Sequence, residues 1–262
     1  MGFGDGRTRR GGSEIGFEIS TEIWIGIGVT FVAALLGGGA GFGYALLSAP
    51  FLLMVGFSPP FVVTANLTLG LTTRAMVAWR LRYHITRRRV GIMLISSVPG
   101  AIVGVIALTT VDESLIRMAT GVLVIVASVG LIWSTSRPEP GQPIPGGAAI
   151  AGVFAGFLGT TTSLSGVPAA VYFIRERLEP VRFLADMAAF FVGGNILALT
   201  MLLISGAFVT SALFPATLLW LPGAMIGNLV GTAIGRRLPH SLFRTFTLIV
   251  VVIAGALTII TS

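Results

Sequence analysis

The residues best suited to chemistry in this chain are glycines and hydroxyl side chains gathered in two short tracts. One tract runs from Gly37 to Gly43 and the other from Gly159 to Gly166. Glycines let a helix break, and a broken helix exposes backbone N–H groups that bind anions. We interpret the tracts as an anion site, against the alternative that the glycines only permit tight helix packing. The candidate ligands are Gly39, Gly41, Gly43, Thr160, Thr161, Thr162, Ser163, Ser165 and Gly166.

A second set of candidates is the polar residues inside long apolar runs, where each needs a partner. Asp186 is the only carboxylate in such a run, and Asn66 holds the matching place in the first half of the chain. Asp186 is either a proton or cation coupling site or a first-turn aspartate favoured by the helix dipole. Arg74 either pairs with an anion or extends toward water. Asn195 and Asn228 either contact substrate or join helices.

Several chemistries are excluded or disfavoured by residue types. The chain has no cysteine, so thiolate catalysis, disulfides and cysteine-bound metals are excluded. Its two histidines, His84 and His240, fall in expected loops, and no cluster has metal-ligand spacing. A single carboxylate inside an apolar run is a poor basis for a membrane-embedded enzyme. We therefore predict a protein that is not an enzyme and that needs neither metal nor cofactor.

Apolar residues dominate the elements that must position these candidates. Hydrophobic residues make up 54% of the 262 positions and charged residues only 10%. Apolar runs of about 20 residues indicate membrane-spanning helices. The 35 glycines favour a closely packed helical bundle, in which Gly223, Gly227, Gly231 and Gly235 have the spacing of a packing face. The expected spans are 61–80, 91–109, 114–134, 183–204, 211–234 and 242–260.

The two halves of the chain resemble each other. Pro50 is matched by Pro168 at an offset of 118 residues, and Ser114 by Ser241 at an offset of 127, as a duplication with small insertions would produce. We predict an all-α integral membrane protein of 8 to 10 membrane segments, in which each half is a broken-helix or re-entrant hairpin plus three transmembrane helices. The expected divisions are a tail at 1–22, a first repeat at 23–134, a proline-rich cytoplasmic linker at 135–147 and a second repeat at 148–262.

Loop charges predict that the two repeats are inverted. Residues 80–89 carry five arginines, whereas the equivalent loop at 205–209 is neutral. Because cytoplasmic loops collect arginine, the two copies should have opposite orientations in the membrane. The chain has 17 basic residues, all of them arginines, and a net charge of +7. The collection of arginine in cytoplasmic loops explains this excess of positive charge. Nucleic acid is therefore not an expected partner.

The sequence also resembles a known family. Residues 156–168, which read GFLGTTTSLSGVP, are similar to the segment that opens the second half of TauE/SafE sulfite-exporter-type proteins. The tract through Gly41 and Gly43 to Pro50 resembles its first-half partner, and the likeness covers residues 23–260. This chain has Gly166-Val167-Pro168 where the family commonly has Gly-Gly-Pro or Gly-Pro-Pro. The resemblance implies a secondary transporter of small sulfur-containing or carboxylate anions.

These observations together predict a secondary transporter of a small anion that works by alternating access in the cell inner membrane, which it crosses several times. The resemblance implies that it is an exporter and that its substrate is sulfite or an organosulfonate such as sulfoacetate. The alternatives are a permease for other small carboxylates or sulfur anions, and a non-transporting membrane subunit. The expected partners are the small anion and the lipid bilayer, with a proton or cation as coupling ion and a homo-oligomer left open.

Overall fold

We describe the protein from a computed structural model that covers residues 21–38, 44–136, 145–176, 178–235, 249 and 252–260. These residues form helices and connecting turns, and no strand occurs among them. Five helical segments of the described chain are long and apolar enough to cross a membrane. The prediction of an all-α integral membrane protein is confirmed. The five segments are Pro59–Arg80, Arg87–Thr110, Glu113–Gly130, Pro180–Ser205 and Thr210–Gly231.

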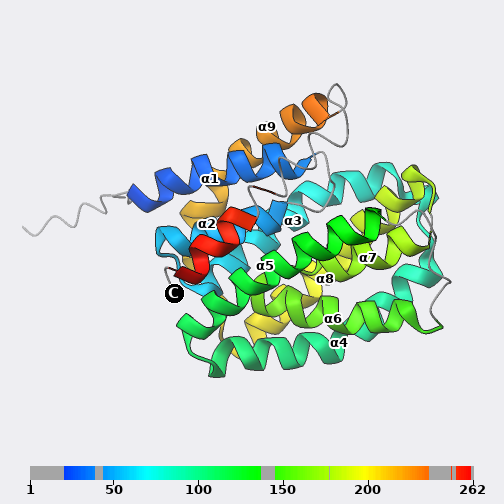
Figure 1. Cartoon of the computed structure of the whole chain (residues 1–262), viewed down its shortest axis with the longest axis horizontal. Helices are drawn as coiled ribbons and strands as arrows, with labels where there is room; N and C mark the ends of the chain where they lie inside the picture. Colours follow the sequence, from blue (N-terminus) through cyan, green and yellow to red (C-terminus); the bar gives the residue numbers. More distant parts are fainter. Residues whose placement is uncertain are drawn as a thin grey trace, which may run out of the picture.

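The described part of the first half begins with two shorter apolar helices and continues with long ones (Figure 1). A single 3₁₀ turn, η1, lies between the long helices α3 and α4. The elements are α1 (Thr21–Gly38), α2 (Tyr44–Val55), α3 (Pro59–Arg80), η1 (Arg82–His84), α4 (Arg87–Thr110) and α5 (Glu113–Ser136).

The second half follows the same order of short and long helices. Residues 252–260 are helical and lie within the last expected span. Most of the expected tail and linker lies outside the described residues. The elements are α6 (Gly147–Thr162), α7 (Gly166–Arg175), α8 (Pro180–Ser205), η2 (Thr210–Ala212), η3 (Leu213–Thr217) and α9 (Leu218–Gly235).

Both glycine tracts coincide with breaks between helices. In the first, α1 ends at Gly38 and α2 begins at Tyr44, with 39–43 outside the described residues. In the second, α6 has 16 residues and α7 has 10, or about 24 and 15 Å by helical rise, so neither crosses a core of about 30 Å. Helix α6 runs past Gly159 to Thr162, so the break lies in the second part of the tract, between Thr162 and Gly166. The three threonine hydroxyls at the end of α6 donate hydrogen bonds to carbonyls one turn earlier in the helix.

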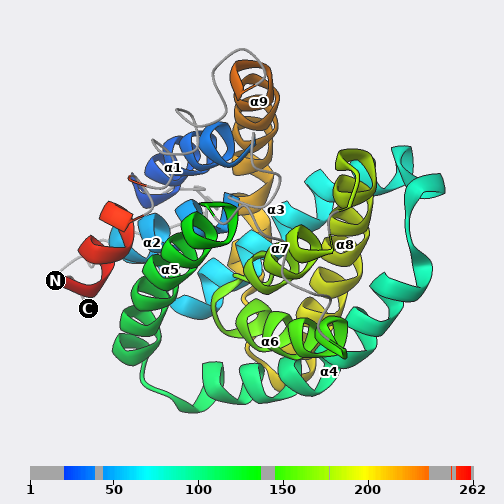
Figure 2. The ribbon, with the colours of Figure 1, turned by 45° about the vertical axis from the view of Figure 1, so that its right-hand side comes forward.

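The first helix of each half packs against a helix of the other half. Helix α6 packs on α4, where a Cβ on Gly100 would lie 1.9 Å from the Val153 oxygen. Helix α1 packs on α9, where a Cβ on Gly231 would lie 1.9 Å from the Leu35 oxygen. The two pairs lie on opposite sides of the molecule (Figures 1 and 2). Glycine is thus required for backbone contact at both crossings, and the packing role expected for Gly231 is confirmed.

Residue contacts give the direction of each pairing. Gly152 lies against Met93 and Gly156 against Ser97, so α6 runs parallel to α4. The other exchanged pair is also parallel, because Trp220 donates a hydrogen bond to the Ile23 carbonyl and Gly231 lies against Leu35.

Helices α3 and α8 pack antiparallel between these pairs. Arg74 contacts Phe191 near one end, and Asn195 donates a hydrogen bond to the Leu67 carbonyl further along. Short connections join α3 to α4 and α8 to the start of α9, so each of these neighbours reverses direction. Matching helices of the two halves therefore run in opposite directions.

Large apolar side chains cover much of the outside of the bundle. Ile95 on α4 and Ile204 on α8 are 75% and 76% exposed, and Leu229 on α9 is 68% exposed. Aqueous proteins rarely expose so many large apolar groups together, whereas lipid tails are a matching solvent for them. Inside, Trp220 is fully buried and contacts the rings of Phe57 and Phe61 edge-on.

Candidate functional site

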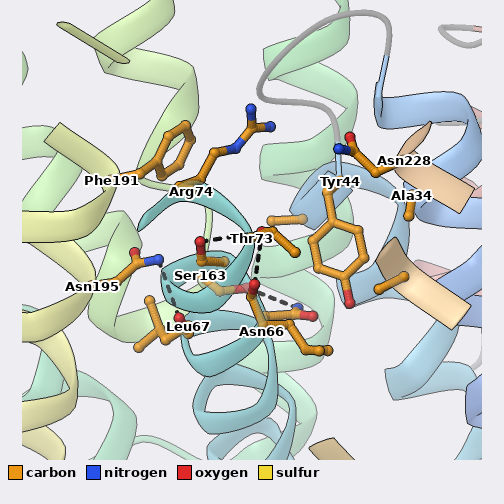
Figure 3. Close-up of a pocket in the computed structure, with 14 residues that line it drawn as sticks. Ala34, Tyr44, Asn66, Leu67, Thr73, Arg74, Ser163, Phe191, Asn195 and Asn228 are labelled. Atoms are coloured by element: carbon orange, nitrogen blue, oxygen red, sulfur yellow. Dashed lines mark hydrogen bonds between the residues drawn. The ribbon is translucent and has the colours of Figure 1, made fainter. Parts of the chain in front are cut away.

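A small cavity lies where elements of the two halves meet. Its volume is about 50 Å³, which is room for a few waters or one small anion. The lining comes from α1, α2 and α3 of the first half and from α8, α9 and the α6–α7 break of the second (Figure 3). The lining side chains are Ala34, Tyr44, Ala45, Asn66, Leu67, Leu69, Gly70, Thr73, Arg74, Ser163, Phe191, Asn195, Ala224 and Asn228.

Asn66 joins the two broken-helix elements at the floor of this cavity. Its side-chain oxygen accepts a hydrogen bond of 2.9 Å from the Ser48 hydroxyl on α2. Its side-chain nitrogen donates one of 3.1 Å to the Ser163 hydroxyl oxygen at the α6–α7 break. All three side chains are buried. A change in the relative position of the two breaks must therefore break or lengthen one of these bonds.

Ser163 holds an unusual backbone conformation. Its φ of 62° lies in the left-handed region, which glycine adopts freely and serine adopts at a cost of about 1–3 kcal/mol. Its hydroxyl also donates a hydrogen bond of 2.6 Å to the carbonyl oxygen of Thr162. The lone pairs of the hydroxyl oxygen remain available to accept the hydrogen bond from Asn66. The side chain thus contributes a bond that glycine would lack.

Arg74 is the only charged side chain among the described residues that line the cavity. Its guanidinium lies 5.6 Å from the centre of the Phe191 ring on α8, and the described residues offer it no carboxylate within salt-bridge distance. In Figure 3 the guanidinium lies on one side of Ser163, with Tyr44 and Asn228 across from it. The cavity therefore has a positive charge whose only described partner is the face of an aromatic ring.

Neutral polar groups share the rest of the lining with apolar side chains such as Leu67, Leu69 and Phe191. The buried Tyr44 hydroxyl lies near Ser48 but makes no hydrogen bond of ordinary geometry with a described residue. Asn195 lines the cavity and donates a hydrogen bond of 3.2 Å to the Leu67 carbonyl, which joins α8 to α3. One guanidinium with hydroxyl and amide groups in a partly apolar cavity is suited to a small anion rather than to a cation.

The structure brings together four of the expected site residues, namely Asn66, Arg74, Ser163 and Asn195. The threonines of the second tract lie elsewhere. The Thr160 hydroxyl donates to the Ala101 and Gly156 carbonyl oxygens, each at 3.1 Å. The Thr162 hydroxyl donates a hydrogen bond of 2.9 Å to the Leu158 carbonyl oxygen. Thr161 donates to Phe157 in the same way. Ser165 lines a separate space of about 10 Å³, Gly166 begins α7, and Gly39, Gly41 and Gly43 lie outside the described residues.

Asp186 lies outside the cavity and is fully buried. One carboxylate oxygen accepts a hydrogen bond of 2.6 Å from the Thr86 backbone N–H, and the other accepts one of 3.0 Å from Arg89. Arg89 also reaches Glu176 at 3.5 Å. The first-turn alternative for Asp186 is wrong, because α8 begins at Pro180 and the helix-dipole effect fades within one turn.

Sequence reasoning missed Tyr44 and Ser48 as members of the site. Tyr44 is the first residue of α2. Its position directly after the first glycine tract is the sequence feature that could have identified it as a site residue. Ser48 lies one turn later, where the helical repeat places it on the same face. Neither residue is charged, so the search for buried ionisable groups passed over both.

Comparison with known protein families gives one match. The family described as Sulfite exporter TauE/SafE matches residues 26–258. No curated protein and no solved structure matches.

Proposed function

The chain belongs to the TauE/SafE sulfite exporter family, and we propose that it is a secondary transporter that moves a small anion through the cavity at Arg74. Family membership and the apolar helices make it a multi-pass membrane transporter of the sulfite exporter type. The proposal adds the site, the charge of the substrate and the mechanism. It also places the protein in the inner membrane.

The observation that carries the proposal is the charge of Arg74 within a membrane span. An arginine at the centre of a span costs about 2.5–3.5 kcal/mol on insertion scales, and such residues are usually paired. Arg74 has the Phe191 ring beside it and no carboxylate partner among the described residues. A bound anion would supply the missing charge and would have Tyr44 and Asn228 within the same cavity.

The size of the cavity favours the smallest of the expected substrates. A volume of about 50 Å³ suits an anion of a few heavy atoms such as sulfite. Sulfoacetate and other organosulfonates would need a wider conformation. Small carboxylates remain the alternative substrate class, because a guanidinium binds carboxylate and sulfur oxyanions by the same paired hydrogen bonds.

Alternating access is supported by the arrangement of the two halves. Matching helices run in opposite directions, and α1 and α6 are exchanged between the halves. Transporters with inverted repeats hold their substrate between the repeats, near discontinuous helices, and rock one repeat against the other. The Asn66 bonds to Ser48 and Ser163 lie at that junction.

Sulfite flux from proteoliposomes tests this proposal. Vesicles that contain the purified protein should release trapped sulfite faster than empty vesicles. Arg74→Gln should lower that rate at least tenfold, because it removes the positive charge that the described lining places in the cavity. Arg182→Gln is the matched control, since Arg182 is exposed and pairs with Glu179 outside the cavity. Equal flux in the Arg74→Gln and Arg182→Gln proteins would overturn the proposal.

A further inference from the structure

A dense positive surface lies at the end of α3, away from the cavity. Residues 80–89 contain five arginines and no acidic residue. Arg80, Arg82, Arg87 and Arg88 are exposed, and none makes a salt bridge among the described residues. We call these four residues the arginine surface. Only the fifth, Arg89, is neutralised, by Asp186 and Glu176.

The start of α4 makes this surface electrostatically unfavourable as it stands. Helix α4 begins at Arg87, and Thr86 provides no side-chain cap. The N-terminus of a helix carries about half a positive charge, so arginines in the first turn are repelled by it. Asp186 offsets Arg89, but Arg87 and Arg88 have no such partner among the described residues. A bound anion would relieve both the arginines and the uncapped N–H groups.

Arg82 is held ready for such an anion. Its guanidinium lies 4.7 Å from the Trp79 ring centre and 4.4 Å from the Tyr83 ring centre. It donates hydrogen bonds of 3.0 Å to the Trp79 carbonyl and to the Tyr83 hydroxyl. A guanidinium has five N–H donors, so others remain for an external acceptor. Because these contacts already fix the Arg82 side chain, less side-chain conformational entropy is lost when an anion binds.

The apolar neighbours of the arginine surface indicate where the anion comes from. Trp79 and Tyr83 are 68% and 82% exposed, and Met76 one turn earlier is 59% exposed. Tryptophan and tyrosine are typical of the boundary between headgroups and acyl chains. A soluble anion would leave these apolar groups in water, whereas a phospholipid covers them with its chains.

We propose that the arginine surface binds the phosphate headgroups of anionic phospholipids in the cytoplasmic leaflet. Clusters of four or more arginines directly beside a span are typical of such binding. Trp79 and Tyr83 position the lipid at the boundary, and Arg80, Arg82, Arg87 and Arg88 contact its phosphate. The site is independent of substrate transport.

Native mass spectrometry of the full chain in detergent tests this inference, with phosphatidylglycerol and phosphatidylcholine as the probes. We expect several-fold tighter binding of phosphatidylglycerol, and a loss of about fivefold in relative affinity for each of Arg80→Gln, Arg87→Gln and Arg88→Gln. The preference should also weaken as salt is raised. The three substitutions are also combined in one triple variant, and the single variants keep the experiment informative if that protein does not fold.

Controls decide whether the surface itself is responsible. Arg175→Gln with Arg182→Gln removes two exposed arginines, one at the end of α7 and one in the first turn of α8, on either side of the connection that carries Glu176 and Glu179, and should leave the preference intact. An equal loss in that control would mean that net charge alone is responsible and would overturn the site. Equal binding of both lipids by the unaltered protein would also overturn it. So would displacement of phosphatidylglycerol by millimolar inorganic phosphate, since the site would then recognise a soluble anion.

Discussion

At the scale of single residues, the site depends on a few polar groups that each make at least one contact with the other half of the chain. Asn66 is the clearest case, because one end of its amide contacts Ser48 and the other contacts Ser163. Arg74 likewise lies over Phe191 of the second half. Neither residue's role can be understood within its own helix, since the contacts that define it cross the junction.

Ser163 allows the hydroxyl and the backbone to be tested separately. Ser163→Ala keeps the strained φ and leaves the Asn66 amide nitrogen without its acceptor, which should lower the free energy of unfolding by about 1–3 kcal/mol. Ser163→Gly loses the same bond but removes strain of about 1–3 kcal/mol, so it should be the more stable variant. Thermal unfolding in detergent measures both. A glycine variant less stable than the alanine variant would contradict the strain at this residue.

Polar residues in apolar runs were the most reliable guide to the site in the sequence. Asn66, Arg74 and Asn195 were singled out because burial in a membrane span demands a partner, and all three line the cavity. The hydroxyls of Thr160 and Thr162 misled because a helix carbonyl one turn earlier already satisfies them. Whether a threonine bonds to its own helix depends on where the helix ends, and α6 extends three residues beyond Gly159.

At the scale of helices, the exchanged pairs depend on backbone contact. Gly100→Ala places a Cβ 1.9 Å from the Val153 oxygen, which α6 can relieve only by moving away from α4. We expect a loss of about 1–3 kcal/mol or more in the free energy of unfolding.

Gly91→Ala on the same helix is the matched control, because nothing lies within 4 Å of its Cβ position. It should be neutral or slightly stabilising, since alanine is the better helix former. Thermal unfolding of the two variants measures the difference. Equal stability would contradict the close approach of α4 and α6.

Asp186 tests whether the bridge between α4 and α8 is structural or takes part in coupling. Asp186→Asn keeps an acceptor for Thr86 but removes the charge that faces Arg89. If the carboxylate is a structural partner, stability should fall by about 3–5 kcal/mol with transport still driven by the same gradient.

The prediction of a coupling role for Asp186 has the opposite signature. In that case the Asp186→Asn protein would remain folded, and its sulfite flux would no longer respond to an imposed proton or cation gradient. Unfolding temperature and gradient-driven flux, measured on the same preparation, separate the two outcomes. Unchanged stability together with unchanged gradient dependence would contradict both roles.

At the scale of the whole molecule, the sequence predicted the positions of five long helices well, and the sixth expected span, 242–260, lies partly outside the described residues. Their ends are set by hydrophobic length and by loop charges, both of which are visible in one chain. The exchange of α1 and α6 between the halves could not be predicted. The exchange depends on which helix backbone each glycine contacts. Gly100 and Gly231 lie in similar apolar segments, and their partners, Val153 and Leu35, are distant in the sequence, so the sequence does not indicate the pairing.

Alternating access requires that the cavity be reached from both sides of the membrane. Because the chain has no cysteine, Thr73→Cys introduces a single thiol in the cavity lining. A membrane-impermeant maleimide should label it from either side of sealed vesicles, whereas Ala185→Cys, at a fully buried position, should stay unlabelled. Labelling of the Thr73→Cys protein from one side alone would contradict the rocking of the two halves.

The central claim is that an anion binds beside Arg74 at the junction of the two halves, and calorimetric titration of the purified protein with sulfite tests it most directly. The account predicts measurable binding by the unaltered protein and by Arg182→Gln, and at least tenfold weaker binding by Arg74→Gln, because a hydrogen bond to a charged group contributes about 1.5–3 kcal/mol. Binding of equal strength in the Arg74→Gln protein would contradict it.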